Sequence, residues 1–211
     1  MVVNLPTSAF RANPLLPDSA ITPALEGGRC PHMAVLLRTP EELYPVLASF
    51  YALGAKRGGW IVHRSRPGEV ESDRAQLVSA GLNVAELEAA GTLSIVEFDM
   101  AETPEQASTR WLAQLDAALA KGFTAMWYSR FVIVNGEEFT ASMAFDEAWD
   151  RDFSGRAVVT LCPYIAGSLS DAGDQHLLDH QHDDILITGD TGITRQAGRR
   201  DAGPPLETAG A

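Results

Sequence analysis

Short apolar runs alternate with longer amphipathic segments through most of this chain. Runs of this length, rich in β-branched residues, are typical of strands that are buried on both faces of a sheet. We expect such strands at residues 33–37, 60–63, 93–98, 124–128, 157–161 and 184–187. The intervening segments repeat their apolar residues at helical spacing, and they predict helices at residues 40–57, 72–80, 84–90, 104–121, 137–151 and 168–180.

Two of the expected helices begin with the same signature. Thr39-Pro40-Glu41 and Thr103-Pro104-Glu105 each place a threonine at the N-cap, a proline at the first helical position and a carboxylate in the first turn. These residue types suit a helix start because the threonine can accept a backbone N–H and the carboxylate favours the positive end of the helix dipole. We therefore expect both threonines to cap their helices.

Strands that alternate with helices indicate βαβ units, and hence a mostly parallel sheet. The fold class expected is α/β, with three layers, six to seven strands and helices on both faces. One domain at residues 29–190 accounts for this pattern. The Pro-, Ala- and Ser-rich residues 1–28 predict a flexible arm, and residues 191–211 predict a disordered tail.

The segment Gly155–Tyr164 (GRAVVTLCPY) is the strongest candidate for a central strand with a polar end. Because proline cannot donate to a sheet ladder, we expect the strand to stop before Pro163. Cys162 and Tyr164 would then lie at the carboxyl end of the strand, where open α/β sheets bind ligands.

Composition and charge narrow the class of protein. The chain has 211 residues, of which 45% are hydrophobic and 21% charged, which suits one globular core. The net charge of −12 argues against direct binding to nucleic acid, because phosphates would be repelled. No apolar run suggests a membrane span and the N-terminus lacks a signal-peptide pattern, so we expect a cytoplasmic protein. Cys30 and Cys162 are then expected as thiols rather than a disulfide, although a redox pair stays open.

The residues that follow the first strand argue against nucleotide hydrolysis. A phosphate loop needs glycines, a lysine and a serine or threonine at fixed spacing. Here the strand is followed by Arg38-Thr39-Pro40-Glu41-Glu42, whose acidic pair would repel phosphate. No nucleophile elbow is present either, since Ala166-Gly167-Ser168-Leu169-Ser170 lacks the second glycine. We therefore expect no enzymatic activity and no cofactor.

The histidines and cysteines leave a metal site open. His176 and His180 have the i, i+4 spacing of two ligands on one helix face, although a solvated helix end explains them more simply. Cys30 and His32 could form a Cys/His site with Cys162 if their strands are neighbours. Zinc proteases have a glutamate between two such histidines, and none stands between His176 and His180. We therefore expect that the chain binds no metal ion.

Several strings along the chain resemble the MEDS domain (methanogen/methylotroph, DcmR sensory domain). The resemblance covers about 160 residues and rests on the order of the strings rather than on one diagnostic motif. The matching stretches are His32 before MAVLL, EELYPVLASFYALGAKRGGWIV, LVSAGLNVAELEAAGTLSIVEF, LAQLDAALAKGFTAMWYS, LCPY and LLDHQHDDIL.

This resemblance implies a fold similar to the RecA-like core of circadian-clock ATPases, without a phosphate loop, that senses hydrocarbon or halogenated-hydrocarbon derivatives. Members commonly sit beside DNA-binding, kinase-like or anti-sigma modules, and no such module is visible here. The family often carries an acidic residue after the strand at 124–128, where this chain has Trp127-Tyr128-Ser129-Arg130. The ligand of this chain is therefore expected to differ in charge or shape.

The sequence thus favours a stand-alone sensory domain that binds a small apolar or halogenated ligand. It would signal to a separate regulatory protein of the transcription-factor, kinase or anti-sigma type, without contacting nucleic acid or membrane, and a homodimer is left open. Alternatives are a Cys/His metalloprotein or thiol-dependent enzyme, and a non-catalytic interaction module. The expected pocket lies at the carboxyl ends of the strands and is lined by His32, Trp127, Tyr128, Arg130, Cys162, Tyr164 and His182.

Overall fold

A computed structural model of the chain describes residues 21, 31–99, 101–168, 182–189 and 192–197. The strands are β1 (His32–Leu37), β2 (Trp60–Ser65), β3 (Leu93–Glu97), β4 (Met126–Arg130), β5 (Val158–Ile165), β6 (Asp184–Gly189) and β7 (Gly192–Ala197). The helices are α2 (Leu43–Lys56), α3 (Val70–Ser79), α4 (Val84–Ala89), α5 (Pro104–Ala120) and α6 (Gly136–Phe153), and the 3₁₀ turn η1 (Pro40–Glu42) precedes α2.

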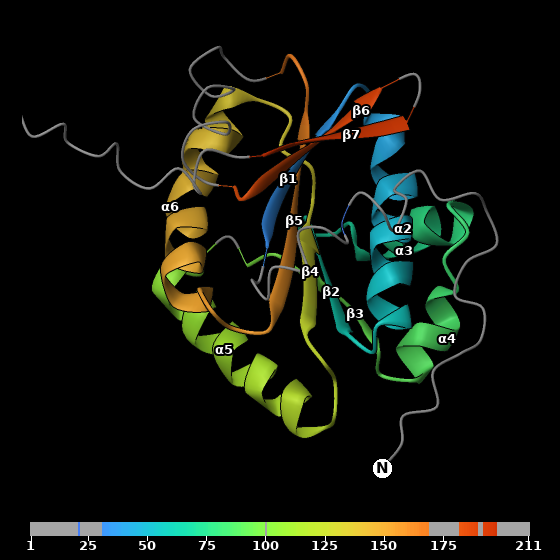
Figure 1. Cartoon of the computed structure of the whole chain (residues 1–211), viewed down its shortest axis with the longest axis vertical. Helices are drawn as coiled ribbons and strands as arrows, with labels where there is room; N and C mark the ends of the chain where they lie inside the picture. The colour runs from blue at the N-terminus through green and yellow to red at the C-terminus, as the bar shows by residue number, and fades with distance from the viewer. Residues whose placement is uncertain (1–20, 22–30, 100, 169–181, 190–191, 198–211) are drawn as a thin grey trace, which may run out of the picture.

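The strands form a sheet in the order β3-β2-β4-β5-β1-β6-β7. All neighbouring pairs are parallel except β6 and β7, which are antiparallel. Helices α5 and α6 cover one face of the sheet, and α2, α3 and α4 cover the other (Figure 1). The three-layer, mostly parallel α/β architecture predicted from the sequence is therefore confirmed.

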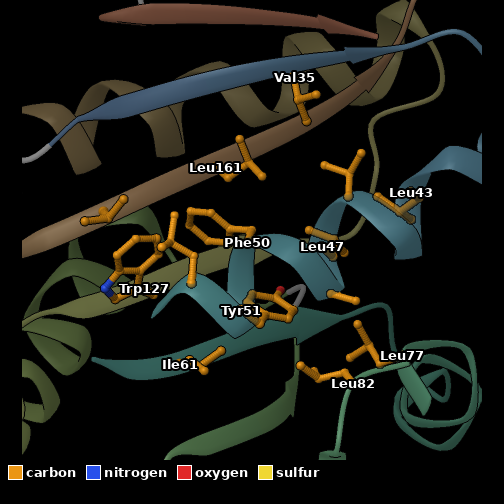
Figure 2. Close-up of a cluster of buried hydrophobic side chains, with 14 of the residues drawn as sticks. Val35, Leu43, Leu47, Phe50, Tyr51, Ile61, Leu77, Leu82, Trp127 and Leu161 are labelled. Atoms are coloured by element: carbon orange, nitrogen blue, oxygen red, sulfur yellow. The ribbon is translucent and has the colours of Figure 1, made fainter. Parts of the chain in front are cut away.

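The face covered by α2 carries the larger apolar core (Figure 2). Helix α2 contributes Leu43, Leu47, Phe50 and Tyr51 to it, and the strands contribute side chains such as Trp127. Two glycines let the helix end approach the sheet closely. A Cβ atom on Gly54 would lie 2.7 Å from Trp127 Cγ, and one on Gly59 would lie 2.2 Å from Trp127 Cδ1.

The two predicted threonine caps have different outcomes. Thr103 forms a full capping box with Gln106, in which its hydroxyl accepts the Gln106 N–H and the Gln106 side chain accepts the Thr103 N–H. Thr39 has extended backbone angles but makes no side-chain cap bond, and a 3₁₀ turn stands between it and α2. The helix-start signature is thus confirmed at residue 103, whereas the capping role of Thr39 is wrong.

The expectation that Pro163 ends the central strand is also wrong. Strand β5 runs through Pro163 to Ile165, so Cys162 lies inside the strand. The physical reason is the length of its neighbour, because the ladder between β4 and β5 ends at the pair Ser129 and Leu161. Successive N–H groups of a strand point to alternate neighbours, and that of Thr160 reaches Pro31 on the β1 side. The missing N–H of Pro163 therefore faces the side where no β4 ladder remains, and no ladder bond is lost.

The ends of the chain differ in part from expectation. Residues 192–197, which the composition placed in a disordered tail, form β7 against β6. In the segment predicted as an arm, Ile21 is buried in the core, and the rest of residues 1–28 lies outside the described residues. Within the part of the chain that is described, no helix has the length and apolar character needed to cross a membrane.

Candidate functional site

A small cavity lies between the sheet and helices α5 and α6. Alternate strand residues point to this face, so Arg64, Arg130 and Cys162 line it from neighbouring positions on β2, β4 and β5. Two residues earlier on β4 and β5, Tyr128 and Thr160 also line the cavity. His32 of β1 joins them, because it is the cross-strand neighbour of Thr160. The volume of the cavity is about 20 Å³, which is enough for a water molecule.

Aromatic rings from several elements form the walls. Trp149 of α6 lies with its ring centroid 4.2 Å from that of Tyr128 and 4.0 Å from that of Phe153, and its indole N–H donates to Thr160 Oγ1 over 3.0 Å. Phe145 packs edge-on against Phe98 at 5.4 Å. These contacts give the cavity a largely apolar wall that α6 and the sheet share.

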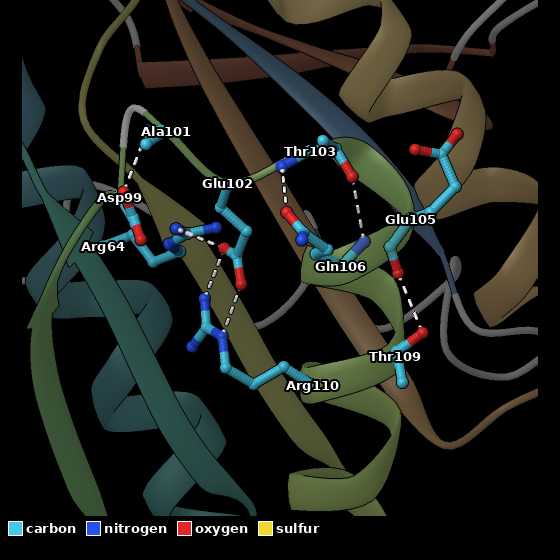
Figure 3. Close-up of polar contacts among 9 residues, drawn as sticks. All are labelled: Arg64, Asp99, Ala101, Glu102, Thr103, Glu105, Gln106, Thr109 and Arg110. Carbon is cyan, nitrogen blue, oxygen red and sulfur yellow. Dashed lines mark hydrogen bonds and ion pairs between the residues drawn. The ribbon is translucent and has the colours of Figure 1, made fainter.

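Two buried arginines supply positive charge to the same space. Arg130 donates to Asp146 Oδ2 over 3.0 Å. Arg64 approaches Glu102 Oε2 at 3.5 Å (Figure 3). The Arg64 guanidinium also lies 4.1 Å from the centre of the Phe98 ring. Arg64 and Arg130 are only 1% and 4% exposed, and their Nε atoms have no hydrogen-bond partner among the residues that the structure describes. Because a buried donor without a partner is costly, each of these N–H groups would gain from a hydrogen-bond acceptor.

A chain of hydrogen-bonded side chains crosses the wall of the cavity next to the arginines. His32 Nε2 lies 3.2 Å from Cys162 Sγ, and His32 Nδ1 lies 2.7 Å from Asp150 Oδ1. Burial lowers the pKa of His32, but the Cys162 sulfur and the Asp150 carboxylate outweigh it and raise that pKa well above its usual value. The imidazole is thus held in one orientation, with Nε2 directed at the thiol.

His182 and Tyr164 extend this group away from the cavity. The ring of His182 lies 4.5 Å from that of His32 and 5.8 Å edge-on from that of Tyr164. Burial raises the pKa of the Tyr164 phenol well above its usual value, so the group is a neutral hydroxyl at physiological pH. Both side chains are buried, at 0% and 1% exposure for Tyr164 and His182.

The structure brings most of the sequence-predicted site residues together but moves the site. His32, Tyr128, Arg130 and Cys162 line one cavity, and Tyr164 and His182 contact its wall. Trp127 points to the opposite face, where it packs against Phe50. Trp127 thus lies on the other side of the sheet from this cavity, because adjacent residues of a strand face opposite sides.

The cavity coincides only in part with the carboxyl ends of the strands. Arg64 and Arg130 stand near the ends of β2 and β4, but Cys162 lies in the middle of β5 and His32 begins β1. The stagger of the strands brings these different positions level with one another. Arg66, the first residue after β2, pairs with Glu138 at 2.7 Å. Cys30, His176 and His180 lie outside the described residues.

Sequence reasoning missed the contribution of α6 to the site. Asp146, Trp149 and Asp150 all reach the cavity or its histidine from this helix. Their i, i+3, i+4 spacing carried a signal, because it places two carboxylates on the same helix face as Phe145 and Phe153. Acidic residues on an apolar face indicate buried partners, here Arg130 and His32.

Three comparisons with known proteins bear on these observations. The family model described as "MEDS: MEthanogen/methylotroph, DcmR Sensory domain" matches residues 31–181. No curated protein matches the chain.

Among solved structures, the chain is similar to the KaiC-like protein PH0186 of the hyperthermophilic archaeon Pyrococcus horikoshii OT3. The TM-score is 0.51 at 12% identity, covering 82% of this chain and 81% of that one. It is also similar to the uncharacterized protein PH0321 of Pyrococcus horikoshii, solved with an unknown peptide, with a TM-score of 0.50 at 12% identity and 79% and 82% coverage. Likeness at this level of identity shows a shared KaiC-like, RecA-type fold.

Proposed function

Because the chain belongs to the MEDS family of sensory domains, we propose that it binds a small apolar or halogenated organic molecule and signals to a separate regulatory protein. The ligand site is the cavity between the sheet and helices α5 and α6. The observation that carries this proposal is the pairing of aromatic walls with the unsatisfied Nε–H groups of Arg64 and Arg130. Such a site suits a molecule with an apolar body and one electron-rich end, such as a halogen or an oxygen.

The size of the cavity supports a mechanism for the signal. At about 20 Å³ it is smaller than any organic molecule, so a ligand must displace side chains to enter. The wall that can yield is the one formed by Phe145 and Trp149, since both are only partly buried and belong to α6. Binding would then shift α6 relative to the sheet and change the outer surface that a regulatory partner contacts.

A thermal-shift experiment tests the ligand site. A panel of small halogenated and oxygenated compounds is screened against the full chain, and a ligand at 100 times its Kd should add about 2.7 kcal/mol to the free energy of unfolding. Ala107 lines the cavity from α5, so Ala107→Leu should fill it and abolish the shift. Ala113→Leu, on the exposed side of the same helix, is the matched control and should retain it.

Two results would contradict the proposal. If no compound class shifts the melting temperature of the wild-type chain, the sensory ligand is of another kind. If a shift appears and survives Ala107→Leu, the ligand binds elsewhere on the molecule.

A second candidate function is thiol-dependent chemistry, and one observation favours it. Cys162, His32 and Asp150 follow one another at 3.2 and 2.7 Å, which is the order in which a nucleophile, a base and an orienting carboxylate are arranged. Cys162 also faces the cavity. Measuring the zinc content and the rate at which iodoacetamide alkylates Cys162 separates this candidate from metal binding by the same residues.

A further inference from the structure

Three metal-ligating side chains from neighbouring strands meet beside the cavity. His32 begins β1, Cys162 lies in β5 and His182 stands two residues before β6, and the sheet order places β1 between the other two. One ligand atom from each residue lies within 4.8 Å of the others, and all three side chains are buried. We propose that His32, Cys162 and His182 bind a zinc ion.

The distances suit such an ion. Zinc binds nitrogen at about 2.0–2.1 Å and sulfur at about 2.3 Å, so the ligand atoms of a tetrahedral site lie roughly 3.3–3.6 Å apart. His32 Nε2 and Cys162 Sγ are 3.2 Å apart. The largest separation in the group is 4.8 Å at most, and a relative movement of the side chains by roughly 1.2–1.5 Å would bring it to the zinc-site value.

The surroundings orient the ligands as zinc sites require. Asp150 accepts a hydrogen bond from His32 Nδ1, which leaves Nε2 as the ligand atom, and a carboxylate in this role is common behind zinc-bound histidines. The backbone N–H of His32 donates to the Asp183 carboxylate, and the Asp183 N–H donates to the His32 carbonyl. These two bonds join the starts of β1 and β6 and hold His182 next to His32.

The charges near the site can balance a cation, because the two arginines of the cavity have carboxylate partners of their own, Asp146 for Arg130 and Glu102 for Arg64. A zinc-bound Cys162 is a thiolate, and together with the Asp150 carboxylate it balances the two positive charges of the ion. Three protein ligands leave a fourth position for water or a small molecule. Because His32 and Cys162 also line the cavity, that position adjoins the space described above.

This inference does not depend on the proposed ligand, since metal content is measured without any organic compound. The full chain is purified in a phosphine reductant without a metal-affinity step, and its zinc is measured by mass spectrometry. We expect one zinc per chain. Cys162→Ser and His182→Ala should each remove it, whereas His63→Gln, which changes a histidine bonded to Tyr51 and Asp73 on the other face of the sheet, should retain it.

Cobalt replacement reports on the site in the unaltered protein. After zinc is removed with a chelator, adding Co²⁺ should produce a thiolate-to-cobalt absorption band in the near ultraviolet. The wild-type result stands even if a variant fails to fold, and circular dichroism of each variant identifies that failure. If the folded, chelator-treated wild-type chain showed no such band, the proposal would be overturned. A band in a folded Cys162→Ser variant would overturn it as well.

Asp150 is a positioning residue, and its effect on affinity is a separate readout. Asp150→Asn should weaken zinc binding by about 10- to 100-fold in competition with a chromophoric chelator. Asp152→Asn, on the same helix but paired with Arg151, should leave the affinity unchanged. If the chain binds no zinc and iodoacetamide alkylates Cys162 much faster than Cys30, the cluster is a nucleophilic thiol instead and the metal proposal is wrong.

Discussion

Glu102 links the cavity to helix α5 through two arginines. It accepts from Arg110 at 2.7 and 2.6 Å and lies 3.5 Å from Arg64, with its own side chain only 9% exposed (Figure 3). The hydrogen bonds from Arg110 lower the pKa of Glu102 below its usual value, although burial acts in the opposite direction. The unfolded chain therefore binds a proton to this group at a higher pH than the folded one.

This shift predicts part of the acid sensitivity of the protein. The stabilising effect of Glu102 is complete above its unfolded-state pKa, near 4.5, and is lost as the pH falls through the lower folded-state pKa. Glu102→Gln should reduce the free energy of unfolding by about 1 kcal/mol at neutral pH and by less in acid. Urea denaturation from pH 7 to about pH 3 measures this difference. The variant Glu105→Gln, at an exposed position, is the control. If Glu102→Gln lowered the free energy of unfolding by the same amount at every pH, the prediction would be contradicted.

The residues of the site show what a sequence can reveal about such chemistry. His32, Tyr128, Arg130 and Cys162 could be found because they lie directly before, within or directly after apolar runs that become neighbouring strands. Asp150 could not be assigned to His32, because nothing in the sequence fixes how α6 lies over the start of β1. Contacts between a helix and a distant strand depend on packing, which the local pattern does not contain.

At the scale of elements, α2 and the turn that follows it pack on the sheet through two glycines, Gly54 and Gly59. A Cβ atom on Gly54 would lie 2.7 and 2.8 Å from two carbons of the Trp127 indole, which is too close for any real contact. Trp127 is itself buried and packs against Phe50 of the same helix (Figure 2). Because protein interiors are close-packed, we expect the buried indole to have little room to move.

The substitution Gly54→Ala therefore has two effects on stability that act in opposite directions. Alanine favours an α-helix over glycine by about 1 kcal/mol, whereas overpacking a filled core costs about 1–3 kcal/mol. We expect the clash to dominate and the free energy of unfolding to fall by about 1–2 kcal/mol. Gly136→Ala, at the start of α6, meets no atom within 4 Å and should change stability by less than about 0.5 kcal/mol. Chemical denaturation of both variants decides, and a more stable Gly54→Ala protein would show that Trp127 can move.

The elements themselves were predictable wherever local chemistry alone decides them. Thr103 and Pro104 indicated the start of α5, because the capping box there involves only residues of the first turn. The end of β5 was not predictable, because Pro163 is tolerated only where β4 has stopped pairing. Strand β7 was missed for a similar reason, since Gly192–Ala197 is polar and becomes a strand by pairing with β6.

At the scale of the whole molecule, the chain shares its fold with KaiC-like proteins, and a network of hydrogen bonds closes the segment after its first strand. The Glu42 carboxylate accepts hydrogen bonds from the Arg38 backbone N–H at 2.9 Å and from Thr188 Oγ1 at 2.5 Å. The Arg38 guanidinium donates to the same carboxylate. The first amide after β1 is thus occupied by a protein carboxylate, where a phosphate loop would offer its amides to phosphate.

We therefore predict that the chain neither binds nor hydrolyses ATP. Magnesium-ATP at millimolar concentration should leave the melting temperature unchanged, and phosphate release should equal that of a protein-free blank. The double variant Glu41→Gln, Glu42→Gln separates charge from loop geometry. It removes the acidic repulsion but leaves the segment without the glycines and lysine that cradle phosphate, so it too should fail to bind. Binding by the double variant alone would show that charge excludes the nucleotide, and binding by the wild-type chain would contradict the prediction.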